Sequence, residues 1–102
     1  DWKYVRIDVK AKLALGQGIW PAIWMLPTDW TYGNWPKSGE IDIMEHVGND
    51  EGTIHGSVHT EAFNHMIGTQ KSKTKYFSVF KVCSFNFNLK KTLIPGIKFL
   101  PK

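Results

Sequence analysis

Residues 2–15 alternate between polar and apolar side chains with a period of two. The polar positions are Tyr4, Arg6, Asp8, Lys10 and Lys12, and the apolar positions are Val5, Ile7, Val9, Ala11 and Leu13. Successive side chains of a strand point to opposite faces, so this pattern predicts a β-strand with one buried face. Gly16-Gln17-Gly18 is typical of the turn that would follow it.

Three more short segments are predicted to be strands, at residues 19–26, 40–47 and 53–60. Pro21 lies inside the first of them and has no amide to donate, so an irregular or edge position is expected there. The segments between them are rich in Gly, Pro, Asn and Asp, which is typical of loops and turns. No stretch has helical periodicity. The pattern therefore predicts an all-β sandwich or barrel.

The third predicted strand, in "GEIDIMEH", carries Glu40, Asp42 and Glu45. Acids are depleted in strands, so three of them in one apolar strand need an explanation. Glu40 and Asp42 keep the two-residue period, whereas Glu45 breaks it. A β-bulge near Ile43 and Met44 would add one residue and return Glu45 to the face of the other two acids.

Carboxyl groups that converge in this way suit hydrolysis of a glycosidic bond with retention of configuration. One carboxylate attacks the anomeric carbon, and the other protonates the leaving oxygen and then activates water. Crowded carboxylates raise one another's pKa, so one can stay protonated near neutral pH. Two alternatives stay open at this point: an exposed acidic strand face, and a calcium or magnesium site built from carboxylates.

Four blocks of sequence occur in a fixed order around these acids: "GIWPAIWMLP", then "SGEIDIMEHVG", "TIHGSVHTEAFNH" and "GTQ", with a Trp-rich loop after the first. Together they closely resemble glycoside hydrolase family 16, and most of all its laminarinase-type endo-β-1,3-glucanases. The family motif is E-x-D-x(x)-E, and this chain has the longer, bulged form. The resemblance covers about residues 2–71.

The resemblance implies an all-β fold that is part of a β-jelly-roll sandwich (concanavalin A-like), in which the concave face of one sheet forms the substrate cleft. By position in the motif, it implies that Glu40 is the nucleophile, Asp42 the assisting acid and Glu45 the general acid/base. It also implies secretion, and a monomer that acts on β-glucan.

Five residues are candidates for contact with substrate. Flat aromatic faces stack on the apolar faces of sugars, and the resemblance matches two tryptophans with cleft residues and one histidine with a residue near the reacting sugar. A core role for at least one of the two tryptophans is an equal alternative. The aromatic-rich loop at residues 27–39 adds a tryptophan and a polar asparagine. The candidates are Trp20, Trp24, Asn34, Trp35 and His59.

The histidines do not indicate a metal site. His55 and His59 share one face of a predicted strand in an H-x-x-x-H spacing, which suggests zinc on a helix but not on a strand without further ligands. His46 and His65 are expected to be ordinary surface or loop histidines. No cofactor is expected; the family analogy allows a structural calcium, but no ligands can be assigned to it.

The net charge of +4 is unevenly distributed. Residues 1–70 carry five basic and nine acidic side chains, a net charge of −4, whereas residues 71–102 carry eight lysines and no acid. A uniformly basic nucleic-acid surface is therefore not implied. We expect residues 1–71 to be part of a family 16 catalytic domain and residues 72–102 to be a basic tail of uncertain relation to it.

Length and composition limit the remaining choices. Complete domains of the family exceed 200 residues, so 102 residues predict a truncated domain. The single cysteine, Cys83, cannot form an internal disulfide. No apolar run approaches 18 residues, so neither a membrane span nor a membrane partner is expected. The preferred function is retaining endo-hydrolysis of β-1,3- or mixed-linkage β-glucan. The alternatives are a non-catalytic β-glucan-binding protein and an inactive fragment of the enzyme.

Overall fold

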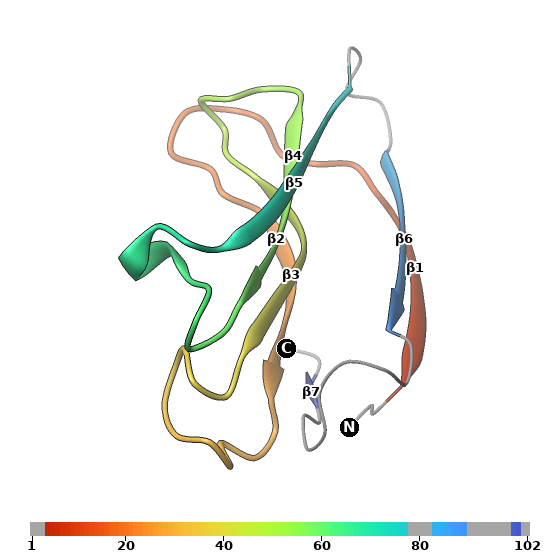
Figure 1. Cartoon of the computed structure of the whole chain (residues 1–102). Coiled ribbons are helices and arrows are strands. Elements are labelled where there is room, and N and C mark those ends of the chain that lie inside the picture. The colour runs from red at the N-terminus through yellow and green to blue at the C-terminus, as the bar shows by residue number, and fades with distance from the viewer. Residues whose placement is uncertain (1–3, 78–82, 90–98, 101–102) are drawn as a thin grey trace.

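The computed structural model describes residues 4–77, 83–89 and 99–100. These residues form two layers of antiparallel strands, which Figure 1 shows as separate sheets. The elements in chain order are β1 (Val5–Ala11), β2 (Ala22–Pro27), β3 (Glu40–His46), β4 (Thr53–His59), the short 3₁₀ helix η1 (His65–Ile67), β5 (Lys71–Tyr76), β6 (Cys83–Leu89) and β7 (Phe99–Leu100). The prediction of an all-β fold is confirmed.

The larger sheet contains five strands in the order β5-β4-β3-β2-β7, and the smaller sheet pairs β1 with β6. In β1 the exposed and partly buried residues alternate throughout, as the sequence predicted, although the strand ends at Ala11. Its apolar Val5 and Ile7 pack against Met25 and Ile41, which are buried at the centre of the five-stranded sheet. The core therefore lies between the two layers.

The five-stranded sheet has a second face, turned away from β1 and β6. The loop at residues 60–70, which contains η1, lies on that side in Figure 1. Residues of β3, β4 and this loop line one hollow together. This outer face carries the candidate site.

The strand predicted at residues 19–26 begins only after Pro21. The carbonyl of Pro21 still accepts a hydrogen bond from the amide of His46 at 3.1 Å, and that of Ile19 accepts one from the amide of Gly48 at 2.8 Å. The chain before β2 thus continues alongside the chain after β3 without regular strand geometry. The irregularity expected at Pro21 is present, because proline cannot donate to the ladder.

Strand pairing does not follow a division at residue 71. β5 pairs with β4 along six residues, from Val58 opposite Lys71 to Thr53 opposite Tyr76. β6 pairs with β1 along seven, from Val5 opposite Leu89 to Ala11 opposite Cys83. The proposed boundary between residues 71 and 72 stays a prediction, but the hydrogen-bonded ladders join both sides of it.

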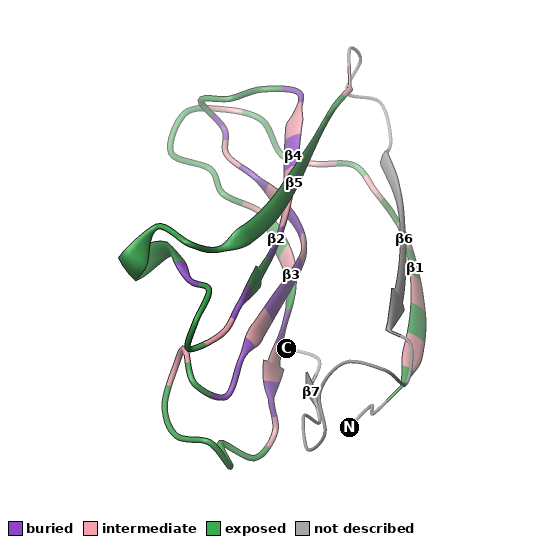
Figure 2. Cartoon of the chain, viewed as in Figure 1, coloured by how far each residue is buried: buried purple, intermediate pink, exposed green. Residues whose placement is uncertain are grey.

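β5 is the exposed outer strand of the larger sheet, as its continuous exposed colour in Figure 2 shows. In the β4–β5 ladder, Lys71, Lys73 and Lys75 pair with those residues of β4 that do not belong to the outer face. Charged side chains along an edge strand discourage pairing with a further chain. In the described part of the chain, no helix is long and apolar enough to cross a membrane.

Candidate active site

A bulge in β3 brings the three acids to one face of the sheet. Asp42 lies opposite Ser57 and Glu45 lies opposite His55, so two residues of β3 face the single residue Gly56 of β4. The β2 register shifts at the same place, since Ile23 pairs with Met44 whereas Trp24 pairs with Asp42. The predicted bulge at Ile43-Met44 is confirmed, and it explains why Glu45 breaks the period of the strand.

The three acids line one hollow on the outer face, with a volume of about 390 Å³. We call it the acid hollow. Its other lining residues are Trp20, Val47, His55, Ser57, His59, His65, Gln70 and Ser72. A second hollow, of about 400 Å³, adjoins it because Glu40 and His65 line both. We call this second one the tryptophan hollow; it is lined by Trp24, Leu26, Trp30, Trp35, Glu40 and His65.

Asp42 is the most strongly perturbed acid of the site. Its burial raises the pKa of its carboxyl from 3.8 to about 8, and the charge of Glu40, a hydrogen bond with Glu40 and the charge of Glu45 act in the same direction. Asp42 is therefore protonated at neutral pH and can donate its proton to a carboxylate oxygen of Glu40. A neutral Asp42 can therefore act as a hydrogen-bond donor to the neighbouring acid.

His59 supports Asp42 from β4. Its Nε2 lies 3.1 Å from Oδ2 of Asp42, and both side chains are more than nine-tenths buried. With the Asp42 proton directed to Glu40, Oδ2 can accept a hydrogen bond from an Nε2–H of His59. His59 also lies opposite Glu40 in the ladder. The structure thus places this predicted substrate residue against Asp42.

Trp20 contacts the third acid directly. Its indole Nε1 donates a hydrogen bond to Oε1 of Glu45 at 3.2 Å, although the tryptophan is 64% exposed. Trp20 therefore forms an open wall of the acid hollow and orients Glu45 at the same time. The alternative that Trp20 is a core residue is excluded by this exposure.

Trp24 and Trp35 come together in the tryptophan hollow, with Trp30 beside them. Trp24 belongs to β2, whereas Trp35 belongs to the loop between β2 and β3. In this loop the buried hydroxyl of Ser38 accepts a hydrogen bond from the amide of Tyr32 and donates one to the carbonyl of Gly33. Asn34 is not among the described residues that line the two hollows. Its backbone carbonyl accepts a hydrogen bond from the amide of Lys37 at 3.0 Å.

One expectation about the histidines is wrong and one is confirmed. His46 is not a surface or loop residue: it is fully buried at the end of β3, because the bulge turns Glu45 outward and His46 inward. His65 is exposed and lies in a loop, as expected, and it also lines both hollows. Only the burial of His46 could have been predicted from the sequence. The bulge that returns Glu45 to the outer face also turns the next residue, His46, to the opposite face.

Among the described residues, one group could hold a metal ion: Glu40, Asp42 and His59 offer ligand atoms that lie within 4.8 Å of one another. The same three side chains contact one another directly, since Asp42 hydrogen-bonds Glu40 and lies against His59. His55 does not join them, because its Nε2 lies 3.4 Å from Oδ2 of Asp50. The geometry is accounted for by protonation and hydrogen bonding among the three side chains.

The bulged acidic strand, the outer-face cleft and the two-layer fold match a known family. Residues 5–95 match the model of the XgeA-like, catalytic GH16 domain. The chain belongs to glycoside hydrolase family 16, and its fold is part of the family's jelly-roll sandwich.

Individual relatives agree with this assignment. A beta-glucanase from Rhodothermus marinus is 57% identical over 73 residues, which are 70% of this chain and 26% of that protein. A beta-1,3-glucan-binding protein from Penaeus monodon is 57% identical over 54 residues, which are 52% of this chain and 15% of that protein. The X-ray structure of the laminarinase from Rhodothermus marinus superposes with a TM-score of 0.84 and 42% identity, over 88% of this chain and 38% of that one. The chain spans well under half the length of each of these relatives.

Proposed function

We propose that this chain carries the catalytic centre of a retaining endo-β-glucanase that acts on β-1,3- or mixed-linkage glucan. The observation that supports this most strongly is the bulge in β3, which brings Glu40, Asp42 and Glu45 to one hollow. The family assignment and the glucanases among the relatives support the substrate class.

In the proposed reaction, ionised Glu40 attacks the anomeric carbon of the sugar at the scissile bond. Glu45 gives its proton to the leaving oxygen, and a covalent glycosyl-enzyme forms. Glu45, now ionised, takes a proton from water, which attacks the same carbon and releases Glu40. Both steps use side chains of this chain and water, so no cofactor is required.

Asp42 assists Glu40 in this scheme. A neutral Asp42 donates a hydrogen bond to the nucleophile, which holds one of its oxygens and stabilises the ionised form. His59 keeps Asp42 oriented through Oδ2. The aromatic residues Trp20, Trp24 and Trp35 present surface to the sugar rings on either side of the acids. Because the substrate is a polysaccharide, we propose that the protein acts outside the cell.

A second function is favoured by the similarity to a beta-1,3-glucan-binding protein. A recognition protein would use the same aromatic cleft without chemistry. The acids argue for the enzyme, because a site that only binds neutral sugars does not need a buried carboxylic acid hydrogen-bonded to a second carboxylate.

The experiment that separates the two functions measures reducing ends released from laminarin, lichenan, agarose and carrageenan, together with binding to laminarin. The enzyme predicts release from laminarin or lichenan, and a Glu40→Gln variant that binds but no longer hydrolyses. Equal release by the variant and the wild type would refute the role of Glu40. Binding of laminarin by the wild type without any release would establish the recognition function instead.

A further inference from the structure

His65 lies where the two hollows meet. It is the first residue of η1, and with Glu40 it lines both the acid hollow and the tryptophan hollow. Glu40 belongs to β3, whereas His65 belongs to the loop that follows β4. A glucan chain that occupies both hollows would therefore pass both of these side chains.

The imidazole of His65 is held by two other rings. Its centroid lies 4.8 Å from that of Trp35, with the planes tilted by 34°, and 5.2 Å from that of His59 in an edge-on arrangement at 84°. His65 nevertheless stays exposed as a residue. Since its orientation is fixed before any sugar arrives, binding through it costs little side-chain entropy.

The backbone that carries His65 is also fixed, by Asn64. Asn64 is 3% exposed, its side-chain oxygen accepts from the amide of Met66, and its side-chain nitrogen donates to the carbonyls of Thr60 and Glu61. Its own amide donates to the hydroxyl of Thr69 at 3.3 Å. Asn64 thus connects both ends of the loop, through its side chain at one end and its backbone at the other, and its side chain caps η1.

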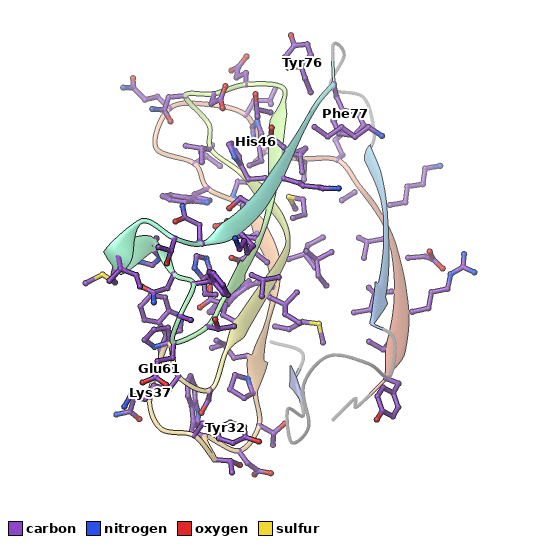
Figure 3. All side chains as sticks on the ribbon, viewed as in Figure 1. Tyr32, Lys37, His46, Glu61, Tyr76 and Phe77 are labelled. Atoms are coloured by element: carbon purple, nitrogen blue, oxygen red, sulfur yellow. The ribbon has the colours of Figure 1, made fainter. Side chains whose placement is uncertain are left out.

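The loop of His65 is tethered to the loop of Trp35. The Nζ of Lys37 lies 3.4 Å from Oε1 of Glu61, and Figure 3 shows the two side chains next to each other. Both are mostly exposed, so the pair itself adds little stability. It does join the loop of Trp35 to the loop of His65.

We propose that His65 is a substrate-contacting residue that hydrogen-bonds the hydroxyl groups of the sugar attacked by Glu40. The imidazole offers one donor and one acceptor, which matches the capacity of sugar hydroxyls to accept and to donate. This inference rests on the proposed function, because it takes the ligand of the cleft to be a β-glucan. It assigns to His65 a role in substrate affinity that is separate from the chemistry of the three acids.

The test measures binding of a β-1,3-linked glucose hexamer by calorimetry, with the whole chain carrying Glu40→Gln to prevent turnover. Three changes are added to this parent. His65→Phe keeps a flat ring against Trp35 but removes the polar atoms, whereas His65→Gln keeps a donor and an acceptor without the ring. Met66→Ala is the matched control, because Met66 is the next residue of η1, is 74% exposed and lines neither hollow.

Loss of one hydrogen bond predicts that His65→Phe raises the Kd by about 3- to 10-fold. His65→Gln is expected to recover part of that loss, and Met66→Ala to stay within about 2-fold of the parent. Thermal melting of each variant shows whether the loop is still folded. Parent-like affinity of His65→Phe would overturn the assignment of His65 alone. Failure of the parent itself to bind the hexamer would overturn the proposed function as well.

Discussion

Trp20 donates the N–H of its indole to Oε1 of Glu45 at 3.2 Å, across 25 positions of sequence. Trp20 precedes β2 and Glu45 follows the bulge of β3, so the bond forms only because β2 and β3 pair with Ala22 opposite Glu45. The relationship ties an aromatic wall of the cleft to the residue proposed as general acid/base. It also gives Trp20 two proposed roles: stacking on a sugar ring and orienting the carboxyl of Glu45.

Trp20→Phe separates these two roles. It keeps a flat ring but removes the donor, so we expect kcat on laminarin to fall by about 10-fold, in keeping with the loss of a hydrogen bond that orients a reacting carboxyl. KM should change little, because the stacking surface remains. Trp20→Ala should lower kcat similarly and raise KM in addition. Unchanged kcat in Trp20→Phe would show that the hydrogen bond does not orient Glu45 for reaction.

Asp42 should make stability depend on pH. Unfolded, its carboxyl loses the proton near its ordinary pKa of 3.8, whereas in the folded protein burial and the neighbouring acids raise the pKa to about 8. Between these values the folded state holds the extra proton, so the contribution of Asp42 to the free energy of unfolding falls as pH rises from about 4 to about 8.

Asp42→Asn removes this dependence while keeping the shape and a hydrogen-bond donor. The free energy of unfolding of the variant, relative to wild type, should therefore rise by at least about 1 kcal/mol between pH 5 and pH 8, since each pKa unit corresponds to about 1.4 kcal/mol. Denaturant titrations at both pH values measure this. Parallel pH profiles of the two proteins would contradict the raised pKa of Asp42.

Gly48 is required for the contact between the chain before β2 and the chain after β3. A Cβ at this position would collide with the carbonyl oxygen of Gly16 and would lie 2.9 Å from the carbonyl oxygen of Ile19, which accepts the Gly48 amide. Backbone cannot move aside as a side chain can. We expect Gly48→Ala to lower the free energy of unfolding by about 2 kcal/mol or more.

Gly56→Ala is the control for this substitution. Gly56 lies opposite the bulge, and a Cβ there would have its nearest neighbour, the carbonyl oxygen of Asp42, at an ordinary 3.5 Å. Its effect on the free energy of unfolding should stay below about 1 kcal/mol. Equal destabilisation by the two substitutions would mean that the close approach at Gly48 does not matter.

The spacing of residues along the chain predicted much of the site. The alternation in β1 and the out-of-step Glu45 are local consequences of side-chain period, so they could be read from the sequence. The bulge also determines that His46 is buried, although the sequence was interpreted otherwise. Trp20, Trp24, Trp35 and His59 line the hollows as expected, whereas Asn34 does not.

Long-range contacts could not be predicted in the same way. The role proposed for His65 depends on how two loops come together, and on the hydrogen bonds of Asn64, none of which follows from periodicity. The pairing of β5 with β4 was hidden by composition, because Lys71, Lys73 and Lys75 suggest a solvated tail rather than an edge strand. β6 returns to pair with β1 from more than 70 residues away, a contact that only the fold as a whole determines.

The central claim, that Glu40 and Glu45 act as nucleophile and acid/base on one bulged strand, is tested most directly by the stereochemistry of the product. Proton NMR can record the anomeric signals of the new reducing ends during the first minutes of laminarin hydrolysis, before mutarotation. Two successive displacements at the same carbon predict that the β-anomer appears first. First appearance of the α-anomer, or release of the same product by Glu40→Gln, would contradict the account.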